Sequence, residues 1–456
     1  MSNQENPDIV LRYEQVLAAL YSREGENVIE PSLDRIRMLL DYLGNPEKAY
    51  RVIHVAGTNG KTSTSRMIES MLMESGLTVG MTTSPHLHDV RERIRLQGNP
   101  IDFFKFIETY DEIEPFLELV DEKIGDARLS FFEVMTAMAF LAFSDAPVDV
   151  AVIEVGLGGT WDATNVVEAD VCVITPIDLD HQSYLGDTIE EIAGEKAGII
   201  KQNNVVVSAK QNEIATEVIA NRAQETSSAL FFAGSEFGVI ERNLAIGGQV
   251  VSIQGLSNKF EEVILPLLGE HQASNAALAV AAIEAFFGAG VDVKKLNPEI
   301  VEQGLGKVTS PGRLEIIRRG PTVLADVAHN PHGAKSLVNA LESEFDFQYL
   351  VAIVGMFSDK DANKFLEILQ PSINHLIVTQ TSHVRAMPVE TLHRFASNHF
   401  DEDQLDSRPD VASAIEYAIE LADNIMGEEE SGVGILITGS VYTVSQARAL
   451  LGKIFA

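Results

Sequence analysis

Short apolar runs alternate with amphipathic helical patterns along most of the chain. Helical patterns such as Ser130–Phe143 separate the runs. Four runs in the first half are apolar at nearly every position, as expected of parallel strands covered on both faces: Val52–Val55, Val148–Val155, Val171–Thr175 and Val205–Ala209. This alternation predicts an α/β fold, with a mostly parallel sheet and helices on both of its faces.

A second strand–helix series follows the segment Glu302–Gly312, which has three glycines, a proline and few apolar residues. Its predicted strands are Thr322–Ala325, Tyr349–Val354, Leu376–Thr379 and Gly434–Thr438. A chain of 456 residues exceeds what one core usually supports. We therefore expect an N-terminal domain over 1–301, a linker over 302–312 and a smaller, Rossmann-like α/β domain over 313–456.

The amino-acid composition limits which molecules the protein can bind and in which cellular compartment we expect it. The formal net charge of −33 argues against nucleic acid and against an anionic membrane surface. The N-terminus has no apolar segment of a signal peptide, and no apolar stretch approaches transmembrane length. The single Cys172 cannot form an intrachain disulfide, which suits a reducing compartment. We expect a cytoplasmic protein with small-molecule partners.

A glycine-containing loop follows the first apolar run. Its residues are Gly57, Thr58, Asn59, Gly60, Lys61, Thr62 and Ser63, and a helical pattern comes next. Strand, glycine loop and helix together direct backbone N–H groups toward a phosphate. Lys61 would reach the outer phosphates, and the Thr62 hydroxyl would bind magnesium. The loop is one residue short of the usual pattern, because Val55 stands where the first glycine is expected. A plain glycine-rich turn is the alternative.

Four polar residues of the first half could share one metal ion with a bound nucleotide: Ser84, Glu154, His181 and Lys196. Oxygen ligands with one imidazole suit magnesium or manganese better than zinc. Singly, each signal has a structural alternative, such as a buried glutamate that accepts hydrogen bonds. Lys196 lies on an apolar helical stripe, so it either extends its ammonium to water or lies beside metal and phosphate.

Three further features could carry chemistry. Arg91, Arg93 and Arg95 form either a cationic cluster or the polar face of a strand, with equal support. Asp326 and His329 follow a strand at i,i+3, where they could contact phosphate or an incoming amine. The same segment also predicts a helix start capped by Asn330, and both interpretations can hold together. A serine-hydrolase site has no support, because the Gly-x-Ser-x-Gly elbow is missing from the sequence.

Eight motifs in order resemble the folylpolyglutamate synthase/dihydrofolate synthase family of the Mur ligase superfamily, in its bacterial bifunctional type. They are HVAGTNGKTS (54–63), TSPHL (83–87), EVGLGGTWDATN (154–165), DHQSYLG (180–186), GEKAGI (194–199), GEHQASN (269–275), SPGR (310–313) and DVAHNP (326–331). The resemblance covers nearly the whole chain. It implies a monomeric, ATP-dependent ligase that adds L-glutamate to dihydropteroate and to reduced folates through an acyl phosphate.

The resemblance also implies roles for individual residues. Lys61, Lys196, Asp326 and His329 would be catalytic, with Lys196 carbamylated. Thr62, Ser84, Glu154 and His181 would bind magnesium, two ions being expected. The nucleotide would contact residues 57–63, His271, Asn275, Arg313 and Asp326. The folate or glutamate substrate would contact Pro85, His86, Arg91, Trp161, Asp162 and His329.

Other interpretations remain open at this point. A folylpolyglutamate synthase without the dihydrofolate synthase activity and a cell-wall peptide ligase of the Mur type are the nearest. A P-loop module that hydrolyses ATP slowly as a switch belongs to another class, but it gives DVAHNP and SPGR no role.

Two positions vary from the family pattern. Val327 stands where glycine is usual, and Trp161 could pack over a pterin ring or in the core.

Overall fold

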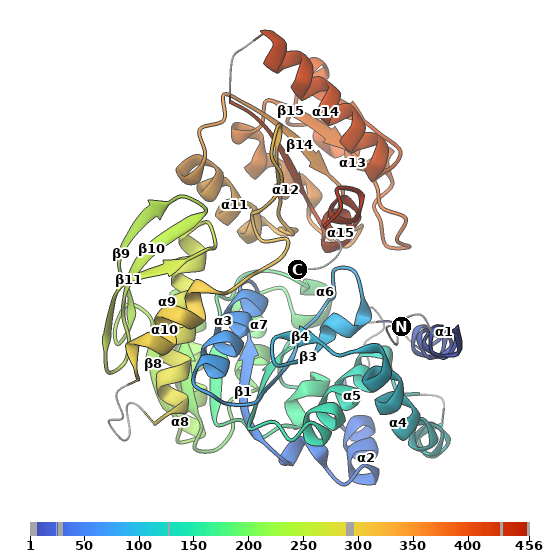
Figure 1. Cartoon of the computed structure of the whole chain (residues 1–456), viewed down its shortest axis with the longest axis vertical. Helices are drawn as coiled ribbons and strands as arrows, with labels where there is room; N and C mark the ends of the chain where they lie inside the picture. Colours follow the sequence, from blue (N-terminus) through green and yellow to red (C-terminus); the bar gives the residue numbers. More distant parts are fainter. Residues whose placement is uncertain are drawn as a thin grey trace. The chain divides into compact units, whose positions relative to one another are not determined.

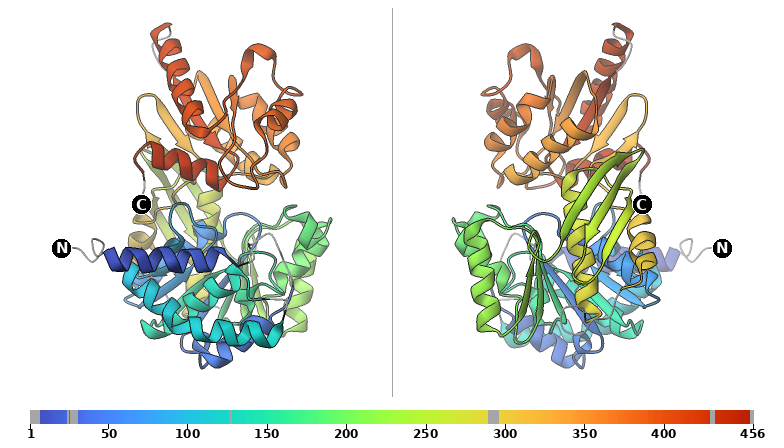
Figure 2. Two further views of the ribbon diagram at one scale, coloured as in Figure 1. Left: turned by 90° about the vertical axis from the view of Figure 1, so that its right-hand side faces the viewer. Right: turned by 90° about the vertical axis from the view of Figure 1, so that its left-hand side faces the viewer.

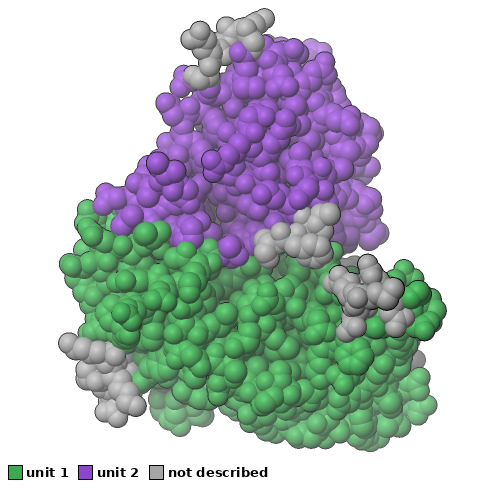
Figure 3. Space-filling model, viewed as in Figure 1, with its two compact units in different colours: residues 1–242, 251–264, 274–308 green, residues 243–250, 265–273, 309–456 purple. Residues whose placement is uncertain are grey.

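The computed structural model describes residues 7–23, 25, 31–125, 128–288, 296–428 and 432–453. The chain divides into two compact units (Figure 3). Unit 1 comprises Met1–Arg242, Val251–Ile264 and Ser274–Val308, and unit 2 comprises Asn243–Val250, Leu265–Ala273 and Thr309–Ala456.

Unit 1 is built on a sheet whose eight strands, among the described residues, run in the order β4-β3-β2-β5-β1-β6-β7-β8 (Figure 1). The strands β2, β5, β1, β6, β7 and β8 are parallel to one another, whereas β3 is antiparallel to both β2 and β4. Their bounds are β1 Arg51–Ala56, β2 Val79–Thr82, β3 Ile94–Leu96, β4 Asn99–Pro100, β5 Val150–Glu154, β6 Val171–Ile174, β7 Val205–Ser208 and β8 Ala229–Phe232.

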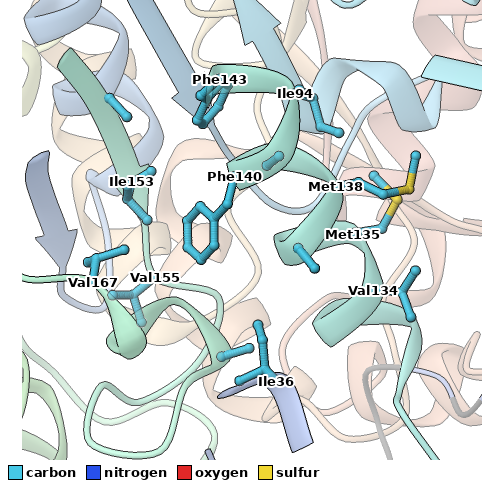
Figure 4. Packing of buried hydrophobic residues seen from close by; sticks show 14 of the residues in the cluster. Ile36, Ile94, Val134, Met135, Met138, Phe140, Phe143, Ile153, Val155 and Val167 are labelled. Atoms are coloured by element: carbon cyan, nitrogen blue, oxygen red, sulfur yellow. The ribbon is translucent and has the colours of Figure 1, made fainter. Parts of the chain in front are cut away.

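Helices cover this sheet on both faces. In β5, Ala151 and Ile153 join a core cluster with α5 (Phe131–Asp145), and Figure 4 shows Ile153 beside Phe140 of that helix. The alternate residues Val150 and Val152 are buried toward the other face, where α3 (Lys61–Glu74) contacts the strand. The helices before residue 309 are α1 Pro7–Tyr21, α2 Asp34–Tyr42, α3 Lys61–Glu74, α4 Phe103–Ile124, α5 Phe131–Asp145, α6 Gln182–Leu185, α7 Ile189–Ala197, α8 Glu213–Glu225, α9 Glu270–Phe286 and α10 Pro298–Gly306, with 3-10 turns η2 Pro46–Lys48, η3 Val90–Arg93 and η4 Ala163–Val166.

A separate three-stranded sheet forms from β9 (Gly238–Ala245), β10 (Gly248–Gln254) and β11 (Lys259–Leu265), visible in Figure 2. Residues 246 and 247 connect β9 to β10. The division between the units passes through these strands. Residues 302–306 of the expected linker belong to helix α10.

Unit 2 contains a six-stranded sheet, in the order β12-β13-β17-β14-β15-β16 among the described residues. The strands are parallel except for the edge strand β12, which pairs antiparallel with β13. The strands are β12 Glu315–Arg318, β13 Thr322–Ala325, β14 Tyr349–Val354, β15 His375–Val378, β16 Leu405–Ser407 and β17 Val433–Thr438. The helices are α11 Pro331–Glu344, α12 Ala362–Leu369, α13 Val389–Ala396, α14 Val411–Glu428 and α15 Val441–Leu450, with η5 Gln370–Ser372 and η6 Glu402–Gln404.

The α/β fold class with two mostly parallel sheets is confirmed. Val327 needs no glycine-like backbone, because its φ is not positive, and its side chain is buried. Within the described part of the chain, every helix is too short or too polar to cross a membrane.

Candidate functional site

The phosphate loop lies at the carboxyl end of the central strand β1 and leads directly into α3. Gly57 has φ 145° and Gly60 has φ 88°, a backbone region that side chains disfavour. A Cβ at Gly57 would lie 1.9 Å from Thr175 Oγ1, and one at Gly60 would lie 2.7 Å from Asn275 Oδ1. Both glycines are therefore required by positive φ and by close packing.

The loop is also tied to the segment after β6. Thr58 N donates to Pro176 O at 2.9 Å, and the Thr58 hydroxyl donates to Asp178 O at 3.0 Å. Asp178 N donates back to the same hydroxyl at 3.1 Å. The carboxyl ends of two adjacent parallel strands thus hold the phosphate loop in one conformation.

Two lysines converge on one backbone carbonyl of this loop. Lys61 Nζ donates to Gly57 O at 3.1 Å, and Lys196 Nζ donates to the same oxygen at 2.9 Å. Burial, and then the nearby charge of Lys61, lower the pKa of Lys196 to about 7. Lys196 is only 4% exposed, so the interpretation that its head extends to water is wrong.

Glu154 ends strand β5, beside β1 and β2. The Thr62 hydroxyl donates to its Oε1 at 2.9 Å, and the Thr83 hydroxyl donates to its Oε2. Ser84 follows Thr83 after β2. The structure therefore brings the predicted residues Thr62 and Glu154 into contact, with Ser84 at the neighbouring strand end.

His181 lies in the loop after β6, at the N-cap of the short helix α6, with φ 53°. Within the described residues, no three His, Cys, Asp or Glu side chains form a group that could hold a metal. Magnesium does not need such a group, since it keeps several waters and binds one or two carboxylates together with substrate phosphates. The buried Glu154 carboxylate and the Thr62 hydroxyl supply oxygen donors of this kind.

Hydrogen bonds between its own residues stabilise the loop that contains Asp162. Asp162 is 2% exposed and accepts hydrogen bonds from Leu157 N at 2.8 Å, Thr164 N at 2.9 Å and Thr164 Oγ1 at 2.5 Å. Burial raises the pKa of this carboxyl. These hydrogen bonds give Asp162 a loop-forming role, and its expected contact with the substrate stays a prediction. Trp161 packs, partly buried, against the unit 1 core.

The three arginines after β2 are all buried, with exposed fractions of 8% for Arg91, 3% for Arg93 and 6% for Arg95. Arg91 pairs with Asp89 at 2.8 Å, and Arg95 pairs with Glu69 at 3.2 Å. The interpretation as the polar face of a strand is therefore wrong, because the three side chains are buried, and the cationic cluster stays a prediction. Arg91 thus forms an internal ion pair, and its expected contact with the substrate stays a prediction.

The Ser84–Asp89 loop contains two further predicted residues. Pro85 is exposed and His86 is half-buried. Arg93 Nε donates to His86 Nδ1 at 2.9 Å. Neither Arg93 nor Thr83 was predicted as a site residue. Thr83 borders the predicted Ser84, but nothing in the sequence pairs Arg93 with a residue seven positions earlier.

In unit 2, Asp326 follows β13 and accepts bonds from Leu314 N and Ala328 N, each at 2.8 Å. Burial raises the pKa of Asp326, and Arg313 opposes this shift. The carboxylate thus ties the SPGR segment to its own loop. The His329 ring nitrogen Nδ1 lies 2.8 Å from Val327 O. Asn330 caps α11 through Gly333 N, and Pro331 is the first helical residue, as predicted.

Two of the predicted nucleotide contacts, His271 and Asn275, belong to helix α9. His271 lies in its first turn, and its ring is adjacent to Gly269. Asn275, one turn later, is 5% exposed and contacts Gly60 of the phosphate loop. Ser63 begins the buried part of α3.

Comparison with family models places two known domains on the chain. The Mur ligase middle domain matches residues 55–283, and the Mur ligase glutamate ligase domain matches residues 312–441. The two matches contain the phosphate loop and the Asp326–Asn330 loop respectively.

Whole-length relatives agree with this assignment. The chain is 45% identical to the dihydrofolate synthase/folylpolyglutamate synthase of Mycobacterium tuberculosis, covering 98% of this chain and 95% of the relative. It is 35% identical to the protein of the same name from Bacillus subtilis, covering 93% and 95%.

Solved structures show the same fold. The Mycobacterium tuberculosis folylpolyglutamate synthase complexed with ADP and AMPPCP matches with a TM-score of 0.93 and 44% identity, covering 97% of this chain and 99% of that chain. An Escherichia coli relative in complex with DHPP and ADP matches with a TM-score of 0.81 and 31% identity, covering 96% and 97%. The chain belongs to the dihydrofolate synthase/folylpolyglutamate synthase family of Mur ligases.

Proposed function

We propose that this protein is an ATP-dependent ligase that joins L-glutamate to dihydropteroate, giving dihydrofolate, and to reduced folates, giving folylpolyglutamates. The substrate carboxylate attacks the γ-phosphate of ATP, giving an acyl phosphate and ADP. The glutamate amine then displaces inorganic phosphate and forms the amide bond. The names of the relatives and the nucleotide complexes of related structures support this proposal.

The observation that carries the proposal furthest is the arrangement around Gly57. Lys61 and Lys196 reach its carbonyl, while Thr62 contacts Glu154 at 2.9 Å. Cations and backbone N–H groups at this strand end suit the transferred phosphoryl group, whose charge must be offset in the transition state. Lys61 is the side chain we assign to that task.

Magnesium fits the oxygen donors of this site. Thr62 and Glu154 would hold it, with Ser84 and His181 as the further predicted ligands and with water and phosphate oxygens completing its shell. Bound magnesium would neutralise phosphate charge, and a second ion is part of the same prediction.

Lys196 is proposed to react with carbon dioxide. A lysine whose pKa is about 7 is substantially neutral at physiological pH, and the neutral amine is the form that adds to carbon dioxide, releasing a proton. The carbamate would carry a negative charge beside Lys61, so attraction would replace the repulsion between two ammonium groups.

His329 is proposed as the acceptor of a proton from the incoming glutamate amine. A backbone carbonyl can only accept, so the contact of Nδ1 with Val327 O places the proton on Nδ1. The neutral ring then carries its lone pair on Nε2. Asp326 orients the same loop through its two backbone hydrogen bonds.

Both substrates are included because the relatives from Mycobacterium tuberculosis, Bacillus subtilis and Escherichia coli carry both activities in their names. A Lacticaseibacillus casei relative is named folylpolyglutamate synthase only, and a Saccharomyces cerevisiae relative dihydrofolate synthetase only. The two acceptors must therefore be tested separately. We also propose a monomer acting in the cytoplasm.

The phosphate-loop assignment is tested by Lys61→Ala. We expect glutamate ligation to fall at least about 100-fold, because the variant loses a charge that acts in the transition state. The circular dichroism spectrum of the variant should match that of the wild type, which shows that the variant is folded. Lys210→Ala is the matched control, since Lys210 is an exposed lysine of the same unit. A Lys61→Ala protein that ligates glutamate as fast as the control would contradict the assignment.

A further inference from the structure

Unit 2 contains a pocket at the carboxyl ends of its parallel strands. Its volume is about 530 Å³, which lies within the range of ligand-binding pockets. The lining comes from the loop after β15, from the start of α13 and from Pro409 after β16. Among the described residues, the lining includes no residue that the sequence assigned to the site. Ligands of open α/β sheets bind at this edge, so the pocket is a candidate for a further substrate contact.

Two side chains of the loop after β15 use acceptor atoms within the protein and keep their donors. Gln380 Oε1 accepts a hydrogen bond from Val389 N at 3.0 Å, and Thr381 Oγ1 accepts one from His383 N at 3.3 Å. Within the described part of the chain, the amide N–H groups of Gln380 and the O–H of Thr381 donate to no protein acceptor. Both side chains can therefore donate to a ligand in the pocket.

Ser382 and His383 show the same arrangement. Ser382 Oγ accepts from Gln446 Nε2 at 3.1 Å, and His383 Nδ1 accepts from Arg385 N at 3.2 Å. Because Nδ1 is the acceptor, the neutral His383 ring carries its proton on Nε2. Burial, and then the charge of Arg385, lower the pKa of His383 and so favour this neutral ring. Four consecutive lining residues thus offer N–H or O–H donors.

The start of α13 adds to this preference for an anion. The helix begins at Val389, and its N-cap residue Pro388 forms no side-chain cap. The N-terminal end of a helix carries partial positive charge and attracts carboxylates. Glu390, an exposed lining residue, opposes such a ligand by its own charge.

The pocket extends outward from the centre of the sheet. At its inner end, the His383 ring lies 4.2 Å from the ring of Tyr442, centroid to centroid, and Tyr442 follows β17. At its outer end, Pro409 follows β16, which is the third strand from β17 in the sheet order. Neighbouring strands lie about 4.8 Å apart, so the two ends are roughly 14 Å apart.

This length fits a chain of γ-linked glutamates better than one glutamate molecule. An ordinary residue spans about 3.5 Å, and a γ-glutamyl unit has two more bonds along the chain, so it spans about 6 Å. Two or three such units match the length of the pocket. Each unit keeps a free α-carboxylate, which only accepts hydrogen bonds and is therefore complementary to a donor lining.

We propose that this pocket binds the γ-glutamyl chain of a folate substrate that already carries several glutamates. The inference rests on the proposed function, because that function supplies such chains as substrates and products. The reacting end of the chain lies at the His329 loop after β13, the strand next to β17. The preceding glutamyl units then extend along the sheet edge into the pocket. Binding there favours the elongation of long chains.

Binding is tested on the full-length protein with ¹⁵N-labelled histidine, with γ-linked triglutamate and L-glutamate as probes. His383→Phe identifies the His383 signals by their loss and keeps an aromatic ring beside Phe357 and Tyr442. We expect triglutamate to shift the His383 signals saturably, at a concentration at least about tenfold lower than L-glutamate requires. Unchanged signals with triglutamate, or an equal response to the two probes, would overturn the inference.

The contribution to catalysis is tested with Ser382→Ala and His383→Phe, each of which removes one donor. Ser397→Ala is the matched control, since Ser397 is an exposed serine at the opposite end of α13. In His383→Phe we expect the KM for tetrahydrofolate with three glutamates to rise roughly tenfold, while the KM for tetrahydrofolate with one glutamate stays constant. Glu390→Gln should lower the KM for the long chain about twofold, because it removes a like charge.

Equal changes in the KM for short and long chains would contradict the proposal. A rise confined to the KM for L-glutamate would assign the pocket to the incoming amino acid and overturn it as well. If His383→Phe does not fold, Ser382→Ala at an exposed position carries the test. The probe titration needs no turnover. Triglutamate binding by a protein that releases no phosphate would therefore contradict the proposed function and support the pocket as a carboxylate site.

Discussion

At the scale of single residues, the site depends on how burial changes ordinary chemistry. Lys196 shows this most directly, because its ammonium is buried, donates to Gly57 O and lies near the charge of Lys61. An ammonium in this environment is costly, and the cost disappears when the group is neutral or carbamylated. The lysine is therefore destabilising as a cation and useful as a reactive amine.

This leads to a prediction on stability and pH. The pKa of Lys196 is about 7 in the folded protein, against 10.5 for a lysine exposed to water, as in the unfolded chain. Between these values the unfolded chain binds more protons, so the free energy of unfolding should rise with pH. Lys196→Met lacks this contribution. The free energy of unfolding of the wild type should therefore rise by up to about 5 kcal/mol, relative to that of the variant, between pH 7 and pH 10.5.

Urea unfolding at several pH values in buffer free of carbon dioxide measures this difference. Parallel pH profiles of the two proteins would contradict the account of Lys196. Restoring bicarbonate should stabilise the wild type at pH 7 and leave Lys196→Met unchanged, because only the wild type can form the carbamate.

At the scale of elements, the phosphate loop is held by its neighbours as much as by its own sequence. Gly57→Ala would place a Cβ 1.9 Å from Thr175 Oγ1, at a position with φ 145°. We expect a loss of about 1–3 kcal/mol in the free energy of unfolding and loss of ATP binding.

Gly194→Ala is the control for that variant. Gly194 lies exposed in α7, and a Cβ there meets nothing within 4 Å. Alanine should leave ATP binding intact and stabilise the helix slightly. Thermal unfolding and ATP titration of both variants make the comparison. Normal ATP binding by Gly57→Ala would show that the loop tolerates a side chain that the geometry excludes.

The sequence predicted those elements whose signals are local. Apolar runs located β1, β5, β6 and β7 to within about two residues, and a capping box of Thr188 and Glu191 starts α7. The sequence did not predict the edge strands β12 and β16, because strands this short are too brief to show a hydrophobic period. The glycines at 304 and 306, which favoured a linker, lie in helix α10. One of them, Gly304, packs against Met71 of α3.

Long-range polar contacts could not be predicted. Asp162 and Arg91 carry charges that sequence patterns assign to ligands, yet both are satisfied within the protein. Arg93 was not predicted as a site residue, because the hydrophobic pattern of the sequence does not reveal its contact with His86. Residue type and strand-end position pointed to one region of the fold, and the three-dimensional contacts add which of its polar groups hold the loops in place.

At the scale of the whole molecule, a net charge of −33 surrounds a site that we propose binds three anionic substrates. The overall field repels these substrates, and salt screens that repulsion over about 10 Å at 0.1 M. We expect the KM for the folate to fall by about twofold between 20 and 200 mM potassium chloride at constant free magnesium. A KM that rises steadily with salt would show that local cationic groups outweigh the field.

The most direct test of the central claim is phosphate release that depends on both glutamate and a folate acceptor, with ATP and magnesium present. Dihydropteroate and tetrahydrofolate are supplied separately, and the products are identified by mass spectrometry. We predict release with each acceptor, matched by a product that has gained one glutamyl residue. A folded protein that binds ATP and yet releases no phosphate with either acceptor would contradict the proposal that it is a folate–glutamate ligase.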